Sequence, residues 1–146
     1  MLLYLDTCCL NRPWDDRRQL RVQLEGDVII AIAASVDVGL IALCSSSVID
    51  FEVARISDSD RLRKVQIFAA KASEYRHYGT VERVRAAALV PLGFRPLDAA
   101  HIACAEAAGA DFLLTTDDRF LKAARRHQNQ LTVQVENPVT WANLAP

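Results

Sequence analysis

The sequence lacks most features that mark fibrous, disordered or membrane-embedded proteins. Its 146 residues include only 5 glycines and 5 prolines, and 51% are hydrophobic against 24% charged, which excludes collagen-like and disordered chains. No run of 18 apolar residues occurs, and the apolar start meets an acid at position 6. We therefore expect neither a membrane span nor a signal peptide, and we expect residues 1–146 to form a single domain with its own core.

Disulfide frameworks and common nucleotide motifs are also missing. The four cysteines are Cys8, Cys9, Cys44 and Cys104, with no C-x-x-C pair and no zinc-finger histidine spacing. Two are adjacent and two lie in apolar runs, which is typical of reduced, buried thiols in a cytoplasmic protein. No G-x-x-x-x-G-K, G-x-G-x-x-G or Ser-His-Asp order is present, so P-loop, dinucleotide-binding and triad chemistry lack support.

The charge balance neither requires nor excludes a polyanionic partner. The formal charge is −1, with 17 basic and 18 acidic residues. If four acids are committed to a metal site, the remaining surface is slightly basic, which permits binding to a polyanion. No long basic run or aromatic ladder indicates a base-stacking surface.

Residues 96–120 predict the central unit of the fold. Asp98 lies in the first turn of an alanine-rich helix, and Gly109 suits the left-handed residue that ends it. Phe112–Thr115 is a short apolar run typical of a buried strand. A helix of about eleven residues is ~16 Å long, and a strand of about five residues returns over a similar length in the opposite direction. Asp98 and Asp117 should therefore meet at the carboxyl edge of a parallel sheet, where open α/β folds bind ligands.

Two further acids have separate reasons to reach that edge. Asp6 ends the predicted strand Leu2–Leu5, although a helix cap or turn residue is an equally ordinary function for Asp. Ser45–Ser47 predicts the start of a helix. At about 100° per residue, Glu52 falls within the apolar stripe of this helix and Asp50 outside it. A carboxylate on a core-facing stripe must be paired, protonated or bound to a cation, so Glu52 is a functional candidate or part of a buried salt bridge.

The remaining chain predicts an alternation of helices and strands. We expect helices at 17–38 (with a split at Gly26-Asp27 as an alternative), 61–73, 81–90 and 119–126, strands at 40–44 and 131–135, irregular segments at 11–16 and 74–79, and a final turn from Asn137-Pro138 to Leu144. This alternation predicts an α/β domain with a mostly parallel sheet of four or five strands.

Four converging carboxylates favour a hard divalent cation. Without compensation, the acids would repel one another and their pKa values would rise. Oxygen-only ligation suits Mg²⁺ or Mn²⁺ rather than Zn²⁺. Such an ion can polarise a phosphoryl oxygen, lower the pKa of a bound water and steady a leaving oxygen.

The motifs also resemble those of a known family. In chain order they are Leu5-Asp6-Thr7 with Asn11, Glu52 on the serine-capped helix, Leu97-Asp98-Ala99-Ala100-His101, Leu114 to Phe120, and Val135-Glu136-Asn137-Pro138. Together they resemble the motifs of PIN-domain ribonucleases, above all the small prokaryotic VapC-like toxins of type II toxin–antitoxin modules. The resemblance spans essentially the whole chain. It implies a single PIN-like domain over residues 1–146, folded as a three-layer α/β/α sandwich.

The resemblance also implies an activity and partners. It implies Mg²⁺- or Mn²⁺-dependent cleavage of single-stranded RNA, a homodimer, and an antitoxin whose tail enters the acidic cleft. The residues that it assigns to the site are Asp6, Glu52, Asp98 and Asp117 as metal ligands, Thr7 and Thr116 as hydroxyl donors, and Asn11 as a support of the first loop. Asp118 is an alternative to Asp117, and His101 would either approach the scissile phosphate or pack its helix.

Two other functions remain as alternatives. One is a catalytically silent PIN-like module that binds protein partners. The other is a Mg²⁺-dependent phosphohydrolase of the haloacid-dehalogenase type, with Asp6 as nucleophile. The chemistry of that class requires a second Asp two residues after the nucleophile, at position 8, where this sequence has Cys8. Cys8-Cys9 also departs from the polar or small residues that the PIN pattern leads us to expect there.

Overall fold

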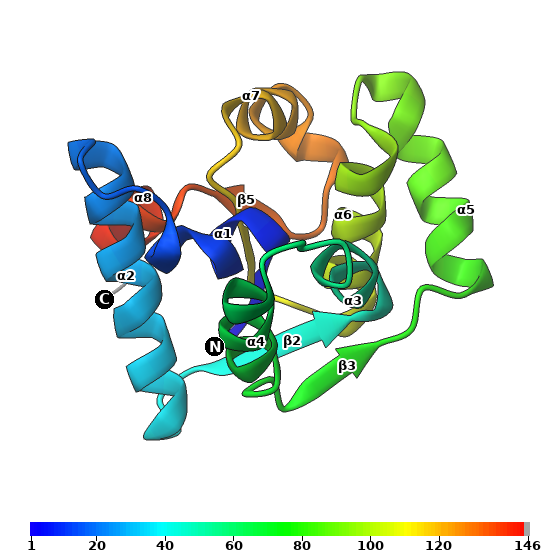
Figure 1. The fold of residues 1–146 in the computed structure, drawn as a ribbon. Coiled ribbons are helices and arrows are strands. Elements are labelled where there is room, and N and C mark those ends of the chain that lie inside the picture. Colours follow the sequence, from blue (N-terminus) through cyan, green and yellow to red (C-terminus); the bar gives the residue numbers. More distant parts are fainter. Residues whose placement is uncertain (145–146) are drawn as a thin grey trace.

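A five-stranded sheet runs through residues 1–144, the part of the chain that the computed structural model describes (Figure 1). Its strands are β1 Leu2–Leu5, β2 Ala42–Ser46, β3 Glu74–Arg76, β4 Phe112–Leu114 and β5 Gln134–Glu136. They lie in the order β3-β2-β1-β4-β5, and every pairing is parallel. The predicted parallel sheet is therefore confirmed, with five strands.

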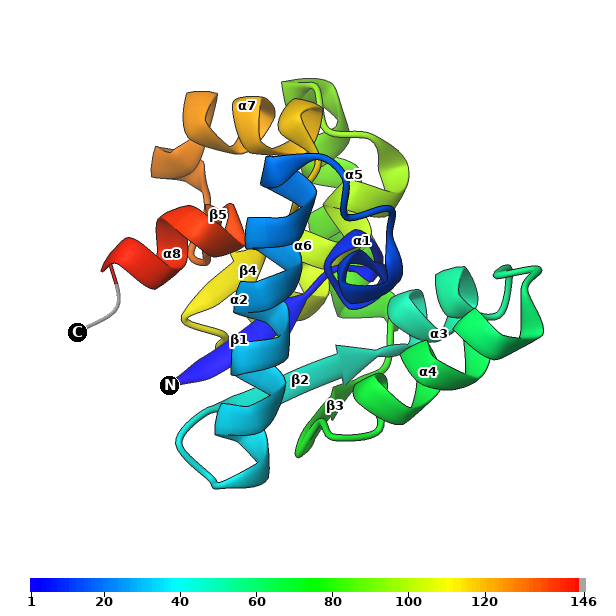
Figure 2. The same ribbon diagram turned by 60° about the vertical axis from the view of Figure 1, so that its left-hand side comes forward.

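Helices cover both faces of this sheet. They are α1 Thr7–Asn11, α2 Leu20–Asp37, α3 Ser47–Val53, α4 Ser59–Ala69, α5 Thr80–Leu89, α6 Pro96–Ala108, α7 Asp118–Arg126 and α8 Pro138–Leu144. The chain moves from β1 outward through β2 to β3, then crosses back to β4 and β5. Because parallel crossovers are right-handed, this reversal puts α2 and α4 on one face and α6, backed by α5, on the other (Figures 1 and 2). The α/β/α sandwich is confirmed.

Helix α6 is the central packing element, as the sequence predicts. Pro96 occupies its first turn, and Gly109 ends it at φ 68°. Seven of its residues, from Ala99 to Ala105, are buried. Five of the seven are alanine or cysteine, whose small side chains let the helix lie close to the sheet, and this closeness fixes where Asp98 and His101 point.

Helix α2 is unbroken, so the expected alternative of a split at Gly26-Asp27 is wrong. The helix begins at Leu20, three residues later than expected, and continues through Gly26 to Asp37. A Cβ atom on Gly26 would lie 2.9 Å from Nη1 of Arg17. The glycine therefore accommodates a crossing side chain, and the tertiary contacts outweigh its low helix propensity.

Two segments expected to be irregular are partly regular. Residues 74–76 form β3, an edge strand whose three side chains are exposed, and an exposed edge strand carries no buried alternation that a sequence pattern could show. In segment 11–16, Arg12–Trp14 form a 3₁₀ turn. The short helix α1 before it, Thr7–Asn11, was not predicted from the sequence. Strands β2 and β5 begin two and three residues later than expected.

Two further 3₁₀ turns, Val90–Leu92 and Gln128–Gln130, complete the connections. Within the described chain, no helix is both long and apolar enough to cross a membrane.

Candidate active site

The centre of the sheet's carboxyl edge brings together the ends of β1 and β4. These strands are neighbours, and the N–H of Asp6 donates to the carbonyl of Leu114 at 3.1 Å. Chain connections leave β1 and β4 in opposite directions along the sheet. Such a reversal leaves a crevice outside the strand ends, where α/β folds bind ligands.

A cavity of about 490 Å³ occupies this crevice. Its lining includes the four predicted acids Asp6, Glu52, Asp98 and Asp117, together with Thr7, Cys8, Arg95 and His101. The acids come from four different elements: the end of β1, helix α3, the first turn of α6 and the cap of α7. The structure therefore gathers in one cavity the four acids that the sequence singled out.

Arg95 bridges two of these acids. Its Nε donates to Oδ2 of Asp98 at 3.0 Å, and its Nη2 donates to Oδ2 of Asp117. Asp117 also caps α7 by accepting the N–H groups of Arg119 at 2.9 Å and Phe120 at 3.1 Å. Despite partial burial, these N–H donors and Arg95 lower the pKa of Asp117. Burial has the larger effect on Asp98 and raises its pKa, although Arg95 opposes the shift.

Glu52 is held by a chain of hydrogen bonds that starts in the core. The hydroxyl of Tyr4 lies 2.7 Å from both Oγ of Ser46 and Nδ1 of His101. Nε2 of His101 in turn contacts Oε1 of Glu52, and the Thr7 hydroxyl donates to the same oxygen at 3.0 Å. Burial alone would raise the pKa of Glu52, but the contacts with His101 and Thr7 lower it. His101, only 3% exposed, contacts an acid of the site while packing within its helix.

Asp6 is the most buried of the four acids. It is 5% exposed, and its Oδ1 caps α1 by accepting the N–H of Cys9 at 3.1 Å. The Cys8 thiol donates to the same oxygen at 2.8 Å. Burial, reinforced by Cys8, raises the pKa of Asp6 well above its usual range. Asp6 is therefore a helix cap, as one of the two expectations had it, and the same side chain lines the cavity.

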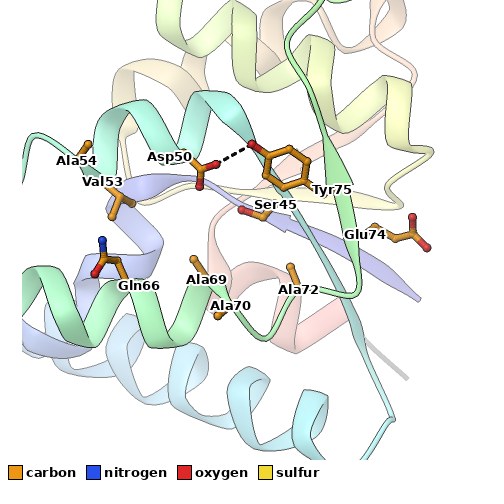
Figure 3. A pocket seen from close by; sticks show the side chains of 10 residues that line it. All are labelled: Ser45, Asp50, Val53, Ala54, Gln66, Ala69, Ala70, Ala72, Glu74 and Tyr75. Carbon is orange, nitrogen blue, oxygen red and sulfur yellow. Dashed lines mark hydrogen bonds between the residues drawn. The ribbon is translucent and has the colours of Figure 1, made fainter.

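The helical period predicts that Glu52 and Asp50 lie on different sides of α3, and the structure places them so. Figure 3 shows Asp50 directed toward the Tyr75 hydroxyl, which donates to its Oδ2 at 2.6 Å, beside a different cavity of about 400 Å³ between α3, α4 and β3. The ring of Tyr75 and several alanines line that cavity. Asp50 is therefore on the far side of α3 from the acidic cavity.

Three supporting residues that the sequence singled out lie outside the cavity lining. Nδ2 of Asn11 donates to the carbonyl of Thr7 at 2.9 Å, which braces α1. Thr116 is buried, and its carbonyl accepts from Nη2 of Arg21 at 3.1 Å. Asp118 forms a two-pronged ion pair with Arg21 at 2.7 and 2.8 Å. The structure thus directs Asp117 into the cavity and Asp118 toward α2.

Sequence reasoning missed Arg95 and Tyr4. Arg95 precedes Asp98 by three residues at a helix start, a spacing that puts two side chains on one face. Tyr4 precedes Asp6 by two residues on a strand, which puts both on the same face of the sheet. Both spacings are visible in the sequence, but neither shows that Arg95 also binds Asp117 or that Tyr4 binds His101.

The donor set fits a hard divalent cation. One guanidinium already occupies the position between Asp98 and Asp117, so carboxylates from two elements converge on a single cationic group. Two more carboxylates line the same cavity, against one arginine. Within residues 1–144 no three of the four acids have oxygens within 4.8 Å of one another. As placed, at most two of them would therefore ligate one Mg²⁺ directly, and the others would bind the waters that this ion retains.

Comparisons with known proteins agree with this architecture. The PIN domain family model matches residues 3–126. Among solved structures, VapBC2 from Rickettsia felis, bound to a DNA fragment from its promoter, aligns with a TM-score of 0.58 at 14% identity, covering 94% of this chain and 98% of that one. PAE2754 from Pyrobaculum aerophilum aligns with a TM-score of 0.53 at 16% identity, covering 99% and 89%. No curated protein sequence gives a significant match.

These likenesses differ in what they establish. The solved structures share too little sequence to show more than the fold. The family model instead covers most of the chain, from β1 to the end of α7, and so includes all four acids of the cavity. The chain belongs to the PIN domain family.

Proposed function

We propose that this protein is a divalent-metal-dependent endoribonuclease that hydrolyses phosphodiester bonds of single-stranded RNA. The observation that carries the proposal is the convergence of four carboxylates on one cavity at the sheet's carboxyl edge, with a single arginine to offset them. Surplus negative charge in a crevice is costly without a cation and useful with one. Membership of the PIN domain family, whose members are generally nucleases, supports the same conclusion.

In this proposal Asp6, Glu52, Asp98 and Asp117 hold Mg²⁺ or Mn²⁺. The bound ion supplies Lewis-acid stabilisation of the phosphoryl oxygens and a lowered pKa for the attacking water. Thr7 and His101 hold Glu52 in place through its Oε1. Asn11, Thr116 and Asp118 act through the backbone and Arg21, by fixing the two loops that carry Asp6 and Asp117.

Arg95 has a distinct part in this proposal. Its side chain is 40% exposed at the cavity mouth, and within residues 1–144 its ion pairs are with carboxylates of the site, Asp98 and Asp117. With a cation bound to those carboxylates, the Arg95 guanidinium would be free to bind a phosphate, for which its planar donor fork is well suited.

We further propose that the protein is the toxin of a toxin–antitoxin pair, works as a homodimer and acts in the cytoplasm. A basic side chain of an antitoxin could take the position that Arg95 holds between Asp98 and Asp117. The fold shared with VapBC2 supports such a partner. Exposed apolar residues on α3 and α5, Phe51, Val81 and Val84, offer a surface for a second copy. Four free thiols suit a reducing compartment.

The test combines metal binding with RNA cleavage. Mn²⁺ binding to the wild type and to Asp98→Asn is measured by calorimetry, and both proteins are incubated with a mixed single-stranded RNA pool, with and without chelator. We expect metal-dependent cleavage by the wild type and its loss in the variant. Well-folded wild type that binds no metal would overturn the proposal and favour a protein-binding module. Trapping of a phosphorylated Asp6 with small phosphate esters would instead revive the phosphohydrolase alternative.

A further inference from the structure

The adjacent cysteines at the start of α1 have no part in the proposed reaction. Asp6 caps this helix, and Cys8 and Cys9 lie in its first turn. In the described chain, one set of three potential ligand atoms lies within 4.8 Å of one another, and it consists of a carboxylate oxygen of Asp6 and the sulfurs of Cys8 and Cys9. Two sulfurs and one oxygen therefore lie close together, and Asp6 and Cys8 of this group line the acidic cavity.

A cation could reach the Cys8 sulfur from the cavity, and it could replace the hydrogen bond that the Cys9 sulfur makes at present. Cys8 lines the cavity and is partly exposed. Its sulfur lies 3.4 Å from the Thr115 hydroxyl and accepts the N–H of Thr116 at 3.4 Å, and such donors stabilise a thiolate. The Cys9 thiol is buried and donates to the carbonyl of Leu114 at 3.2 Å, a weak bond that a metal–sulfur bond would replace.

The ligand chemistry distinguishes this group from the four carboxylates. Thiolates select thiophilic ions such as Zn²⁺ and Cd²⁺, whereas Mg²⁺ and Mn²⁺ prefer oxygen. Three protein ligands beside a cavity from which a water could supply the fourth ligand also match the coordination that Zn²⁺ adopts outside closed structural sites. As each sulfur binds the ion, its thiol proton is released to solvent, so no oxidant or reductant is needed.

We propose that Asp6, Cys8 and Cys9 form a binding site for a thiophilic divalent cation, and that Zn²⁺ bound there switches the nuclease off. Asp6 belongs to both ligand sets, so a zinc ion on the two sulfurs removes one carboxylate from the Mg²⁺ site. The binding stands on the geometry of the three ligands alone. The inhibition rests on the proposed nuclease function.

Binding is tested with Cd²⁺, because Cd–thiolate bonds absorb in the near ultraviolet whereas Cd–carboxylate bonds do not. The protein is titrated with Cd²⁺ in a non-thiol reductant. Cys8→Ser removes one proposed ligand, and Cys44→Ser removes a buried cysteine on β2, away from the site. We expect saturable absorption in the wild type and in Cys44→Ser, and a loss of at least about half the absorption with ~10-fold weaker binding in Cys8→Ser.

Two outcomes of this titration would overturn the site. One is the absence of Cd–thiolate absorption in folded wild type, and the other is equal absorption and affinity in Cys8→Ser. Circular dichroism of each variant establishes that it is folded. Cys9→Ala, which places no polar atom in the core, is the second variant if Cys8→Ser unfolds, and the same loss is expected.

The inhibitory consequence is tested separately. RNA cleavage is measured at fixed Mg²⁺ with increasing Zn²⁺, and each variant's rate with Mg²⁺ alone is its own reference. We expect Zn²⁺ to inhibit the wild type at concentrations at least ~10-fold below those needed for Cys8→Ser. Equal sensitivity of the two proteins would overturn the switch. If the wild type cleaves no RNA while Cd²⁺ still binds Cys8, the nuclease proposal fails and the metal site stands.

Discussion

Two clusters of charged residues, each with a buried acid, lie in this protein, and their acids are compensated in opposite ways. Glu25 on α2 is 1% exposed, yet its carboxylate accepts from Nε of Arg12 and Nε of Arg21, both at 2.7 Å, and from Nδ2 of Asn137 at 2.8 Å. One carboxylate thus has two cations and an amide. The acidic cavity instead has four carboxylates and one arginine. Burial of an acid is common to both clusters, and the uncompensated charge is what distinguishes the candidate site.

The compensated cluster also supports the uncompensated one. Arg21 contacts Glu25 with Nε, while its other nitrogens bind the Thr116 carbonyl and the Asp118 carboxylate. These contacts fix the loop between β4 and α7, which carries Asp117. Glu25 is therefore a structural support of the site, acting through Arg21 and the loop.

The largest expected contrast comes from neutralising one acid in each cluster. Asp98→Asn should lower RNA cleavage by ~10³-fold or more, equivalent to about 4 kcal/mol. It should leave the free energy of unfolding unchanged or slightly higher, because a partly buried charge and its repulsion with Asp117 are removed. Glu25→Gln should leave two arginines poorly paired and lower the free energy of unfolding by about 2 kcal/mol, less than for fully buried pairs because Arg12 and Arg21 are partly solvated. Urea unfolding and RNA cleavage measure both.

The reverse pattern would remove the distinction between the clusters. If Asp98→Asn unfolds the protein while Glu25→Gln abolishes cleavage without loss of stability, the cavity acids are a structural network. Cleavage by Glu25→Gln is measured below its own unfolding transition, so that loss of folded protein is not mistaken for loss of catalysis.

Arg95→Gln sharpens the comparison, because it removes the one arginine that offsets the cavity acids. The variant should bind Mn²⁺ about 10-fold more tightly, since no guanidinium competes for Asp98 and Asp117. RNA binding should weaken at the same time, because the proposed phosphate contact is lost. Calorimetry with Mn²⁺ alone isolates the first effect, and Arg83→Gln, a substitution on the exposed face of α5, is the control. Weaker Mn²⁺ binding in Arg95→Gln would contradict the competition.

What the sequence predicted depends on how local each signal is. The positions of Asp98 and Asp117 follow from one helix, one turn and one strand, whose lengths fix where the chain returns. The separation of Glu52 from Asp50 follows from the period of a single helix. Such arguments need only neighbouring residues, and the structure places all four acids accordingly.

The rest required contacts between distant segments. The hydrogen bond between Tyr4 and His101 joins residues 97 positions apart, and that between Glu25 and Asn137 joins residues 112 apart. No spacing rule can choose such partners. The continuity of α2 through Gly26 likewise depends on the crossing Arg17 side chain, and β3 becomes a strand because β2 offers it an edge.

The hydrogen-bond chain behind Glu52 allows a subtler test with a matched control. Tyr4→Phe keeps the buried ring but leaves Nδ1 of His101 and Oγ of Ser46 without the tyrosine hydroxyl. We expect the free energy of unfolding to fall by about 1–2 kcal/mol and Mn²⁺ affinity to fall about 10-fold, because His101 no longer holds Glu52 as firmly. Tyr75→Phe, which breaks only the exposed contact with Asp50, should change neither quantity measurably. Equal Mn²⁺ affinity in wild type and Tyr4→Phe would show that Tyr4 contributes to packing and does not position Glu52 through His101.

The smallest expected effect is a pH dependence of stability that originates at Asp6. Burial raises the pKa of Asp6 in the folded protein well above the ordinary value of 3.8. Between those two pKa values the folded state binds more protons than the unfolded state, so the contribution of Asp6 to stability falls as pH rises.

The variant Asp6→Asn tests this, because its side chain keeps an oxygen that can cap α1 but cannot ionise. Without metal, the variant should therefore gain stability relative to the wild type as pH rises from 4 toward 8, as measured by urea unfolding in chelator. Saturating Mg²⁺ should stabilise the wild type alone and reduce that gain, because binding to the folded state favours it by mass action. A difference between the two proteins that stays constant across this pH range would show that the Asp6 carboxyl bears no unfavourable charge, and its place among the uncompensated acids would then be wrong.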